Sequence, residues 1–270
     1  MTQAYKFIYV ISLCSMNKYE ELLKEIQKKN ELKGIAKKIV SETLHDYIRK
    51  NNISLEDCNK KDLKMIVKEI RGQLRNLTGM FSQKSTSKDI ALSEYEEENI
   101  LKEHISTSER MHGYNVLKEY INHGNFSSIL DLGCGLNPLI IAKSGITYHA
   151  VDIRQDYLDT VMDFFRSKNI KGTIEICDIR HFLPSVTHAD LVLMLKLLDV
   201  IDKKGHKRAE QLIRALTCRE MLISFSTKTL SGKPMNHPQR GWIERLLKRL
   251  GYTYESFSLY NEIFYRAFKS

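Results

Sequence analysis

The residues with the clearest chemical potential lie where a glycine turn follows an apolar segment. The segment Asp131–Gly135 comes directly after the apolar run 128–130. Glycines at 133 and 135 allow the backbone to turn tightly and to lie close against a ligand. Asp152 ends a second apolar run about 20 residues later, where a carboxylate can accept hydrogen bonds from both hydroxyls of a ribose. This pattern predicts a site for an adenosine-containing cofactor.

The residues after the turn distinguish between cofactors. A dinucleotide-binding turn has a third glycine, which leaves room for pyrophosphate at the start of the next helix. Here Gly135 is followed by Leu136, Asn137 and Pro138 instead. S-adenosylmethionine has no phosphate and does not need that opening. The sequence therefore predicts S-adenosylmethionine, with Cys134 among its contacts, whereas a purely structural turn is the alternative for such a segment taken alone.

Further acids extend the predicted pocket. Asp178 follows the strand-like run 173–177, where it can accept the exocyclic amine of adenine or, alternatively, cap a following helix. Asp131 can lie near the sulfonium or amino group of the cofactor, or cap the glycine turn. The predicted contacts at the strand ends also include Ile153, Ile179 and Leu195.

A segment ahead of the first strand can bind the other end of the cofactor. Arg110 can fork onto the methionine carboxylate, because a planar guanidinium matches a carboxylate, and Thr107 can supply a hydroxyl. A capping box from Ser106 to Glu109, opening a helix over 107–122, is the plainer interpretation. The two interpretations are compatible.

The elements that must position these residues alternate between strands and helices. Apolar runs predict strands at 128–132, 147–151, 173–177, 190–195 and 220–225. The alternating segment 251–268, with a turn near Asn261, predicts an antiparallel hairpin at the end of the sheet. We therefore expect an α/β fold, a Rossmann-like class I methyltransferase sheet.

The chain before this sheet has a different character. Apolar residues recur at helical spacing across 17–81, which predicts a small helical module, and Ser54 with Asp57 resembles a helix N-cap signal. The polar stretch 82–93 is the predicted linker. Two domains follow: an N-terminal helical RNA-binding module at 1–93 and a methyltransferase domain at 94–270.

Charge and cysteine usage narrow the class of protein. The net charge is +9, and the basic residues gather in two blocks that flank a mildly acidic middle: residues 1–88 hold 18 Lys/Arg and 10 Asp/Glu, and residues 203–249 hold 12 Lys/Arg and 3 Asp/Glu. Such blocks favour a polyanionic partner, although a solvated lysine-rich surface gives the same count.

The five cysteines form no C-x-x-C pair, which predicts no zinc site and suits a reducing cytoplasm. No apolar run reaches the length of a membrane span, and the run 7–14 is too short for a signal peptide.

Four segments in order resemble the aminoglycoside-resistance 16S rRNA (guanine-N7) methyltransferases. The residues that carry the resemblance are His104-x-Ser106-Thr107-x-Glu109-Arg110, Asp131-Leu132-Gly133-Cys134-Gly135-Leu136-Asn137-Pro138-Leu139, Leu195-Lys196, and Ile223 to Lys233 with its Leu-Ser-Gly-Lys end. The resemblance implies methyl transfer to N7 of a guanine in the decoding site of 16S rRNA, within the 30S subunit. It also implies that His104, Thr107 and Arg110 face the methionine end of the cofactor. The segment 234–238 is shorter than the family pattern and lacks its glycine.

The residue types agree with an N7 target. Guanine N7 carries an in-plane lone pair and no proton, so transfer needs alignment and no general base. The Asn/Asp-Pro-Pro-aromatic motif of exocyclic-amine enzymes is absent after the fourth predicted strand. Cys218, in a Thr-Cys pair, is expected to be structural and to precede the fifth strand. Adenine-N1 methylation of the same site uses two tryptophans, and this chain has one.

Residues near the expected target are predicted from these considerations. Trp242, Phe225 and Tyr114 can stack on a flipped base, although Phe225 also suits the core. Lys196, beside the cofactor pocket, is the best candidate for a functional lysine. Contacts to phosphates are predicted for lysines in both basic blocks: Lys28, Lys29, Lys37, Lys38, Lys203, Lys204, Lys228 and Lys233.

The prediction is thus a monomeric, cytoplasmic methyltransferase that uses S-adenosylmethionine, no metal and no membrane, and acts on 16S rRNA. Three alternatives remain: methylation of adenine N1, a small-molecule substrate, or an RNA-binding protein with a degenerate pocket. The basic blocks disfavour a small molecule, and retention of Gly133, Gly135, Asp152 and Arg110 disfavours a degenerate pocket.

Overall fold

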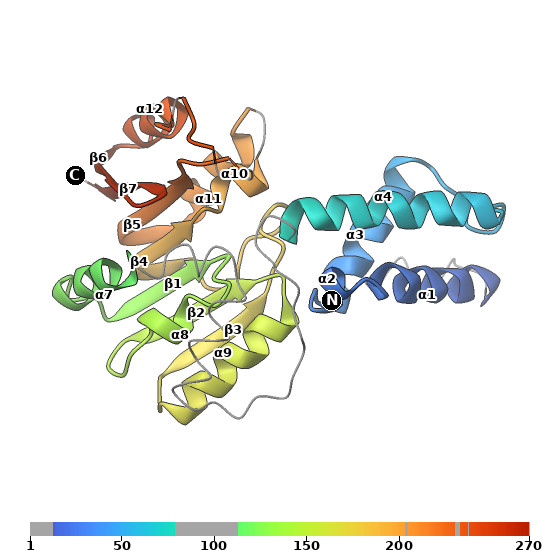
Figure 1. Ribbon diagram of the computed structural model, residues 1–270, viewed down its shortest axis with the longest axis horizontal. Helices are drawn as coiled ribbons and strands as arrows, with labels where there is room; N and C mark the ends of the chain where they lie inside the picture. Colours follow the sequence, from blue (N-terminus) through green and yellow to red (C-terminus); the bar gives the residue numbers. More distant parts are fainter. Residues whose placement is uncertain (1–12, 79–112, 203–204, 230–232, 237, 270) are drawn as a thin grey trace. The chain divides into compact units, whose positions relative to one another are not determined.

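The computed structural model describes residues 13–78, 113–202, 205–229, 233–236 and 238–269. The chain divides into two compact units, Met1–Gly79 and Met80–Ser270 (Figure 1). The linker predicted at 82–93 lies outside the described residues, so the domain limit at residue 93 stays a prediction.

The first unit is helical, as the spacing of its apolar residues predicts. Its helices are α1 (Leu13–Gln27), α2 (Asn30–Lys33), α3 (Lys37–Lys50) and α4 (Lys60–Thr78). Each of the three longer helices turns one apolar stripe inward, and the buried core includes Leu22, Ile26, Ile39, Leu44, Ile70 and Leu74. Packing of these stripes holds together helices that would be marginal in isolation.

The start of α4 differs from the prediction of a cap at Ser54. Asn59 caps the helix instead: its side-chain oxygen accepts the backbone N–H groups of Lys61 (2.8 Å) and Asp62 (3.1 Å). Asp62 reciprocates by accepting the N–H of Asn59 at 3.0 Å, which completes a capping box. The segment before Asn59 is held as a turn because Leu55 is buried and the Lys18 ammonium binds the carbonyl oxygens of residues 55, 56 and 58.

The second unit is built on a seven-stranded sheet of order β3-β2-β1-β4-β5-β7-β6. Only β7 runs antiparallel to its neighbours, so the predicted sheet and closing hairpin are both confirmed. The strands are β1 (Ser128–Leu132), β2 (Thr147–Asp152), β3 (Gly172–Ile176), β4 (His188–Leu195), β5 (Thr217–Ser226), β6 (Tyr252–Leu259) and β7 (Glu262–Lys269).

Helices cover both faces of this sheet. They are α7 (Tyr114–His123), α8 (Pro138–Ile141), α9 (Gln155–Ser167), α10 (Leu198–Ile201), α11 (Lys207–Ala215) and α12 (Gly241–Arg249). Alternate residues of β1 enter two separate cores: Ile129 packs with α7, α8 and α9, whereas Leu130 and Leu132 pack with α11 and α12. The chain order reverses between β1 and β4, and the crevice at the carboxyl ends of such strands is where open α/β sheets bind ligands.

Candidate active site

The glycine turn folds over the carboxyl end of β2. Gly133 and Gly135 both adopt left-handed backbone, with φ of +66° and +51°. The N–H groups of Gly133 and Cys134 donate to the carbonyl oxygen of Val151 at 2.8 and 3.0 Å. The turn is therefore fixed to the strand that ends in Asp152.

Gly133→Ala is expected to destabilise this turn. The left-handed backbone costs about 1–2 kcal/mol for a residue with a Cβ, and a Cβ here would lie 2.8 Å from Cδ1 of Leu197. We expect weaker cofactor binding and a lower melting temperature, checked by calorimetry and thermal unfolding. Gly145→Ala is the control, since Gly145 has a φ of +87° but no atom within 4 Å of its added Cβ. An equal effect of both changes on cofactor affinity would contradict this account.

Asp152 is held by three backbone N–H groups. Its Oδ2 accepts from Gly135 at 2.9 Å, and its Oδ1 accepts from Ile153 at 2.7 Å and Arg154 at 3.0 Å. Burial raises the pKa of Asp152 above its ordinary value, and the three backbone bonds only partly offset this. The carboxylate is thus fixed beside the glycine turn. Ile153 contributes its backbone N–H to this arrangement.

Asp131 lies within β1 and its side chain is fully buried. Its Oδ2 accepts a hydrogen bond from the Tyr148 hydroxyl at 2.8 Å, a partner that the sequence did not suggest. The neighbouring Cys134 is also buried, and burial together with Asp152 and Asp131 raises the pKa of its thiol well above the ordinary value. Cys134 therefore stays protonated and is a packing residue of the turn, not a nucleophile.

Asp178 follows β3 and is nearly buried. The guanidinium of Arg180 binds its carboxylate at both oxygens, with Nε at 2.9 Å from Oδ1 and 3.2 Å from Oδ2. Burial raises the pKa of Asp178, but the hydrogen bonds and charge of Arg180 outweigh it and lower the pKa overall. Asp178 caps no helix: it accepts the N–H of Arg180 at 3.1 Å in a turn, and the next element is β4. Ile179 beside it is buried in the core.

Lys196 follows Leu195 at the end of β4, and both are buried. Lys196 has left-handed backbone, with φ of +56°, and its N–H donates to the carbonyl oxygen of Ser224 at 3.0 Å. Its ammonium lies 3.5 Å from Oε1 of Glu262, and each side chain is only 5% exposed. The hydroxyl of Ser224 donates to Oε2 of Glu262 at 2.6 Å. The sequence missed Glu262, because no local pattern marks the first residue of β7 as the partner of a residue after β4.

The segment after β5 is tied to the end of the sheet by Arg240. Its guanidinium lies 3.1 Å from Oδ2 of Asp199 and 3.2 Å from the carbonyl oxygen of Ser226. Lys228 and Lys233, both exposed, lie on the segment that Arg240 anchors, near a bridge between residues 228 and 234. Arg240 thus positions the segment that carries these two predicted RNA contacts.

Three aromatic residues were candidates for base stacking. Tyr114 is buried and its hydroxyl donates to Oδ1 of Asn137 at 2.6 Å, and Phe225 is fully buried in the core. Neither ring can receive a base. Trp242 is half-buried, packs edge-on against Phe225 and stacks on His206.

Cys218 is the second residue of β5, not a residue before the strand as predicted, and burial raises its pKa to about 11.

The structure thus brings the glycine turn, Asp152, Asp178 and Lys196 to the carboxyl ends of β1, β2, β3 and β4. The predicted contacts His104, Thr107 and Arg110 lie outside the described residues, as do Lys203 and Lys204. Among the residues that the structure describes, no cluster of histidine, cysteine or acidic side chains is suited to a metal ion, and no helix is long and apolar enough to cross a membrane.

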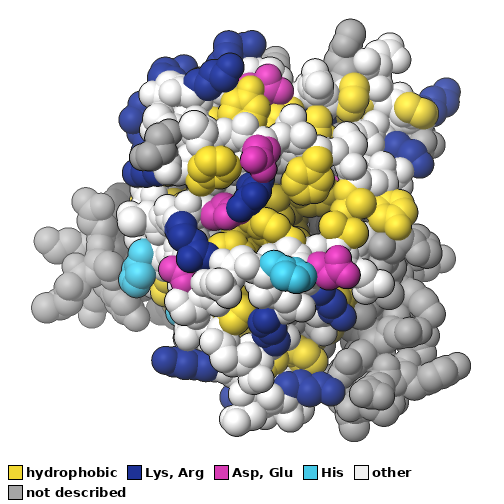
Figure 2. Space-filling model, turned by 90° about the vertical axis from the view of Figure 1, so that its left-hand side faces the viewer, with side chains coloured by type: hydrophobic (Ala, Val, Ile, Leu, Met, Phe, Trp, Pro, Cys, Tyr) yellow, Lys and Arg dark blue, Asp and Glu magenta, His cyan; other side chains and the backbone are white. Residues whose placement is uncertain are grey.

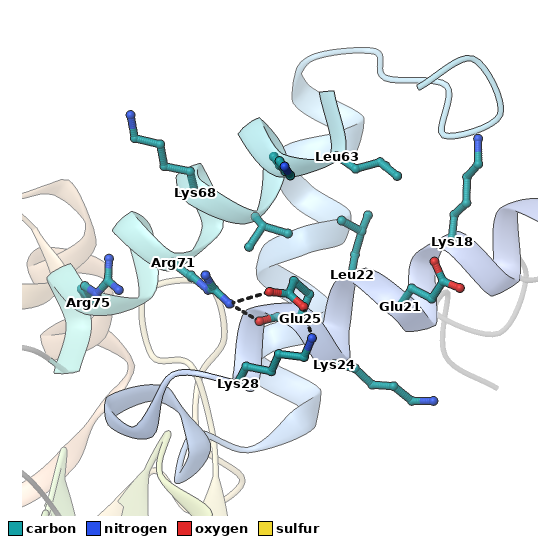
Figure 3. Close-up of a pocket in the computed structure, with 12 residues that line it drawn as sticks. Lys18, Glu21, Leu22, Lys24, Glu25, Lys28, Leu63, Lys68, Arg71 and Arg75 are labelled. Atoms are coloured by element: carbon teal, nitrogen blue, oxygen red, sulfur yellow. Dashed lines mark hydrogen bonds and ion pairs between the residues drawn. The ribbon is translucent and has the colours of Figure 1, made fainter. Parts of the chain in front are cut away.

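The first unit contains a basic groove between α1 and α4, with a volume of about 740 Å³. Figure 3 shows lysines from both helices lining it, with Arg71 directed at Glu25. The residues along it are Lys18, Glu21, Leu22, Lys24, Glu25, Lys28, Leu63, Lys64, Val67, Lys68, Arg71 and Arg75. By contrast, basic side chains on the face in Figure 2 are interspersed with acidic and apolar ones.

The cations of this groove fall into two groups. The first group binds carbonyl oxygens or glutamates within the unit and consists of Lys18, Lys28, Arg71 and Arg75. Lys24, Lys64 and Lys68 have no acidic partner among the described residues. Of the lysines predicted to contact RNA, only Lys28 lines the groove; Lys29 is exposed beside it, and Lys37 and Lys38 pair with Glu20 and Glu42.

Comparison with known proteins places this site in a family. Residues 88–265 match the model of the family described as ribosomal RNA methyltransferase (FmrO). A 16S rRNA (guanine(1405)-N(7))-methyltransferase of Serratia marcescens is 30% identical over 190 residues, covering 68% of this chain and 75% of that protein. An enzyme of the same name from Frankia casuarinae is 28% identical over 51% of this chain and 50% of that protein.

Solved structures agree in fold. The 16S rRNA methylase RmtB matches with a TM-score of 0.70 at 22% identity, over 93% of this chain and 98% of that one. RmtF, crystallised with S-adenosyl-L-homocysteine, matches with a TM-score of 0.72 at 20% identity, over 94% and 98%. The Rossmann-like class I fold with an N-terminal helical region is therefore confirmed, and the chain belongs to the FmrO family of ribosomal RNA methyltransferases.

Proposed function

We propose that this protein transfers a methyl group from S-adenosylmethionine to N7 of a guanine in the decoding site of 16S rRNA, within the 30S subunit. The observation that carries the proposal is the fixed Asp152 carboxylate beside the Gly133–Gly135 turn. The turn follows β1, where the strand order of the sheet reverses, and the chain belongs to an rRNA methyltransferase family. The guanine-N7 assignment is supported by the names of the relatives.

The residues present suit this cofactor. Asp152 offers a fixed, bidentate acceptor for a ribose diol. The turn beside it has room for glycine only at position 133, because an added Cβ would lie 2.8 Å from Cδ1 of Leu197. The cofactor supplies an electrophilic methyl group on a sulfonium. The protein's part is to orient the reacting groups and exclude water, because guanine N7 has no proton to remove. Arg110, Thr107 and His104 remain the proposed contacts for the methionine end.

The thiol of the glycine turn, Cys134, is not suited to a covalent mechanism. Burial, with Asp152 and Asp131 nearby, raises the pKa of Cys134 well above its ordinary value, so it supplies no thiolate at neutral pH. Cys218 lies at the amino end of β5, away from this site, and partial burial raises its pKa to about 11. Lys196 is proposed to position the target, with its ammonium oriented by Glu262. We further propose that the protein acts as a monomer in the cytoplasm, where its methylation of 16S rRNA confers aminoglycoside resistance.

The basic groove of the first unit is the proposed contact to the 30S subunit. Replacing Lys24, Lys64 and Lys68 together by alanine should raise the KM for 30S subunits roughly tenfold or more and reduce the salt dependence of binding by about one unit of slope per lost phosphate contact. Cofactor affinity should not change. Replacing Lys33, Lys50 and Lys61, which are exposed but do not line the groove, removes the same charge and is the matched control. Equal losses in both triple variants would indicate only a general charge effect.

Incubation of 30S subunits with the protein and methyl-labelled cofactor tests the proposal. At a cofactor concentration near the wild-type dissociation constant, we expect near-stoichiometric label in 16S rRNA from wild-type protein and only a small fraction of it, in the same time, from the Asp152→Asn variant. Label in an adenine would favour the N1 alternative. Absence of label from rRNA, combined with cofactor binding, would favour a small-molecule substrate.

A further inference from the structure

The only tryptophan of the chain is covered on one face by a histidine. The rings of His206 and Trp242 are parallel within 3°, with centroids 3.8 Å apart. Trp242 lies in the first turn of α12, and His206 immediately precedes α11. The Phe225 ring packs edge-on against the indole, with centroids 5.7 Å apart, which fixes the indole from another direction. Phe225 thus holds the indole in place, and the His206 ring covers one of its faces; we call this indole face the platform.

Two features of His206 are energetically unfavourable. His206 adopts left-handed backbone, with φ of +54°, which disfavours any residue with a Cβ. Its Nδ1 is buried and has no hydrogen-bond partner among the described residues. A buried polar atom without a partner is unfavourable, because the hydrogen bond that it made to water is not replaced. The stack itself is therefore the main described interaction that keeps this ring in place.

The position of the stack suits a nucleobase. The helices α11 and α12 begin after the loops that follow β4 and β5, at the same end of the sheet as the cofactor residues. Arg240, two residues before Trp242, ties the segment after β5 to Asp199 of α10 and so anchors this platform. Since Tyr114 and Phe225 are buried, Trp242 is the one of the three aromatic candidates that is only partly buried, and His206 covers one face of its ring.

We propose that His206 occupies, in the free protein, the position that the flipped purine takes on Trp242 when the 30S subunit binds. This inference rests on the proposed function. It adds the surface on which the target base stacks, Trp242, and the residue that the base displaces, His206. Stacking of a planar base on an aromatic side chain is tolerant of base identity. The His206–Trp242 pair therefore sets the position of the target, and recognition of guanine belongs to other residues.

The single tryptophan makes the exchange observable. Protein containing 5-hydroxytryptophan can be excited at wavelengths at which ribosomal tryptophans absorb little, so its emission reports on position 242 alone. We expect the emission to change when 30S subunits are added and to stay unchanged with 50S subunits. His206→Ala should alter the emission of the free protein and reduce the change that 30S subunits cause.

Kinetics on the same variants separate stacking from a structural role. Trp242→Leu should lower kcat/KM for 30S methylation about 10- to 100-fold, with unchanged affinity for S-adenosylhomocysteine, and Trp242→Phe should restore part of this loss. His206→Ala should lower the KM about two- to tenfold, because the base no longer displaces a stacked ring.

The outcomes distinguish this inference from the proposed function. Methylation by wild-type protein without any emission change on 30S binding would overturn the inference and leave the proposed function intact. An increased KM in the His206→Ala variant would also overturn it, because the histidine would then assist binding. Absence of methylation would refute the proposed function and, with it, the purine as the occupant of this platform.

Discussion

Asp152→Asn is expected to weaken the binding of S-adenosylmethionine about 100-fold, or about 2.7 kcal/mol. The asparagine side chain loses the charge that strengthens hydrogen bonds from the ribose hydroxyls. Its amide NH₂ would also face either the Gly135 N–H or those of Ile153 and Arg154, which now donate to the carboxylate. Calorimetric titration with the cofactor and with S-adenosylhomocysteine measures the loss.

The matched control is Asp163→Asn on α9. Asp163 is largely exposed, with a side-chain exposure of 68%, and pairs only with a surface arginine. The Asp163→Asn variant should therefore bind the cofactor with the affinity of wild-type protein. If Asp152→Asn binds the cofactor as tightly as wild-type protein, Asp152 does not hold the ribose and the proposed site is misplaced.

The raised pKa of Asp152 gives this site a pH dependence. Burial disfavours the carboxylate, so Asp152 takes up a proton at a higher pH than an exposed aspartate does. Cofactor affinity should therefore fall as the pH is lowered through that pKa, and the Asp152→Asn variant should lack this phase.

Glu262→Ala is expected to have the largest effect on stability. The change leaves the ammonium of Lys196 buried without its carboxylate, and breaking a buried pair in this way costs about 3–5 kcal/mol. A loss of this size should lower the melting temperature by roughly 10 °C in a unit of this length. Glu255→Ala is the control, because Glu255 belongs to the same sheet but is 63% exposed.

A double variant separates the structural and functional roles of this pair. Replacing both Lys196 and Glu262 by methionine removes both charges at similar volume, and such exchanges are often neutral or stabilising. We expect the double variant to have the melting temperature and the cofactor affinity of wild-type protein but a lower rate of methylation. A fully active double variant would show that Lys196 does not position the target.

The strands of the sheet and the cofactor turn could be predicted because their signals are local, whereas the order of the strands in the sheet was not predicted. Apolar runs marked each strand, and Asp152 was found because a strand end followed by an acid is visible along the chain. The helix cap predicted at Ser54 was wrong because the local pattern was overridden by tertiary contacts. Burial of Leu55 and the hydrogen bonds from Lys18 hold that segment as a turn.

The residues that the sequence missed act across long separations. Glu262 reaches Lys196 only because β7 inserts beside β5, and nothing near position 262 encodes that register. His206 reaches Trp242 because two helices begin at the same end of the sheet. Lys24 and Lys68 line the same groove because α1 and α4 pack together. In each case tertiary packing, and not local spacing, brings the side chains together.

The most direct test of the account is to identify the atom that is methylated. Treatment of 16S rRNA with borohydride and then aniline cleaves the chain at N7-methylguanine, and primer extension locates the break. After incubation of 30S subunits with this protein and S-adenosylmethionine, we expect one new stop, in the decoding site, that depends on the chemical treatment. A methylated 16S rRNA without any treatment-dependent stop, or with a stop at an adenine before treatment, would contradict guanine-N7 as the target.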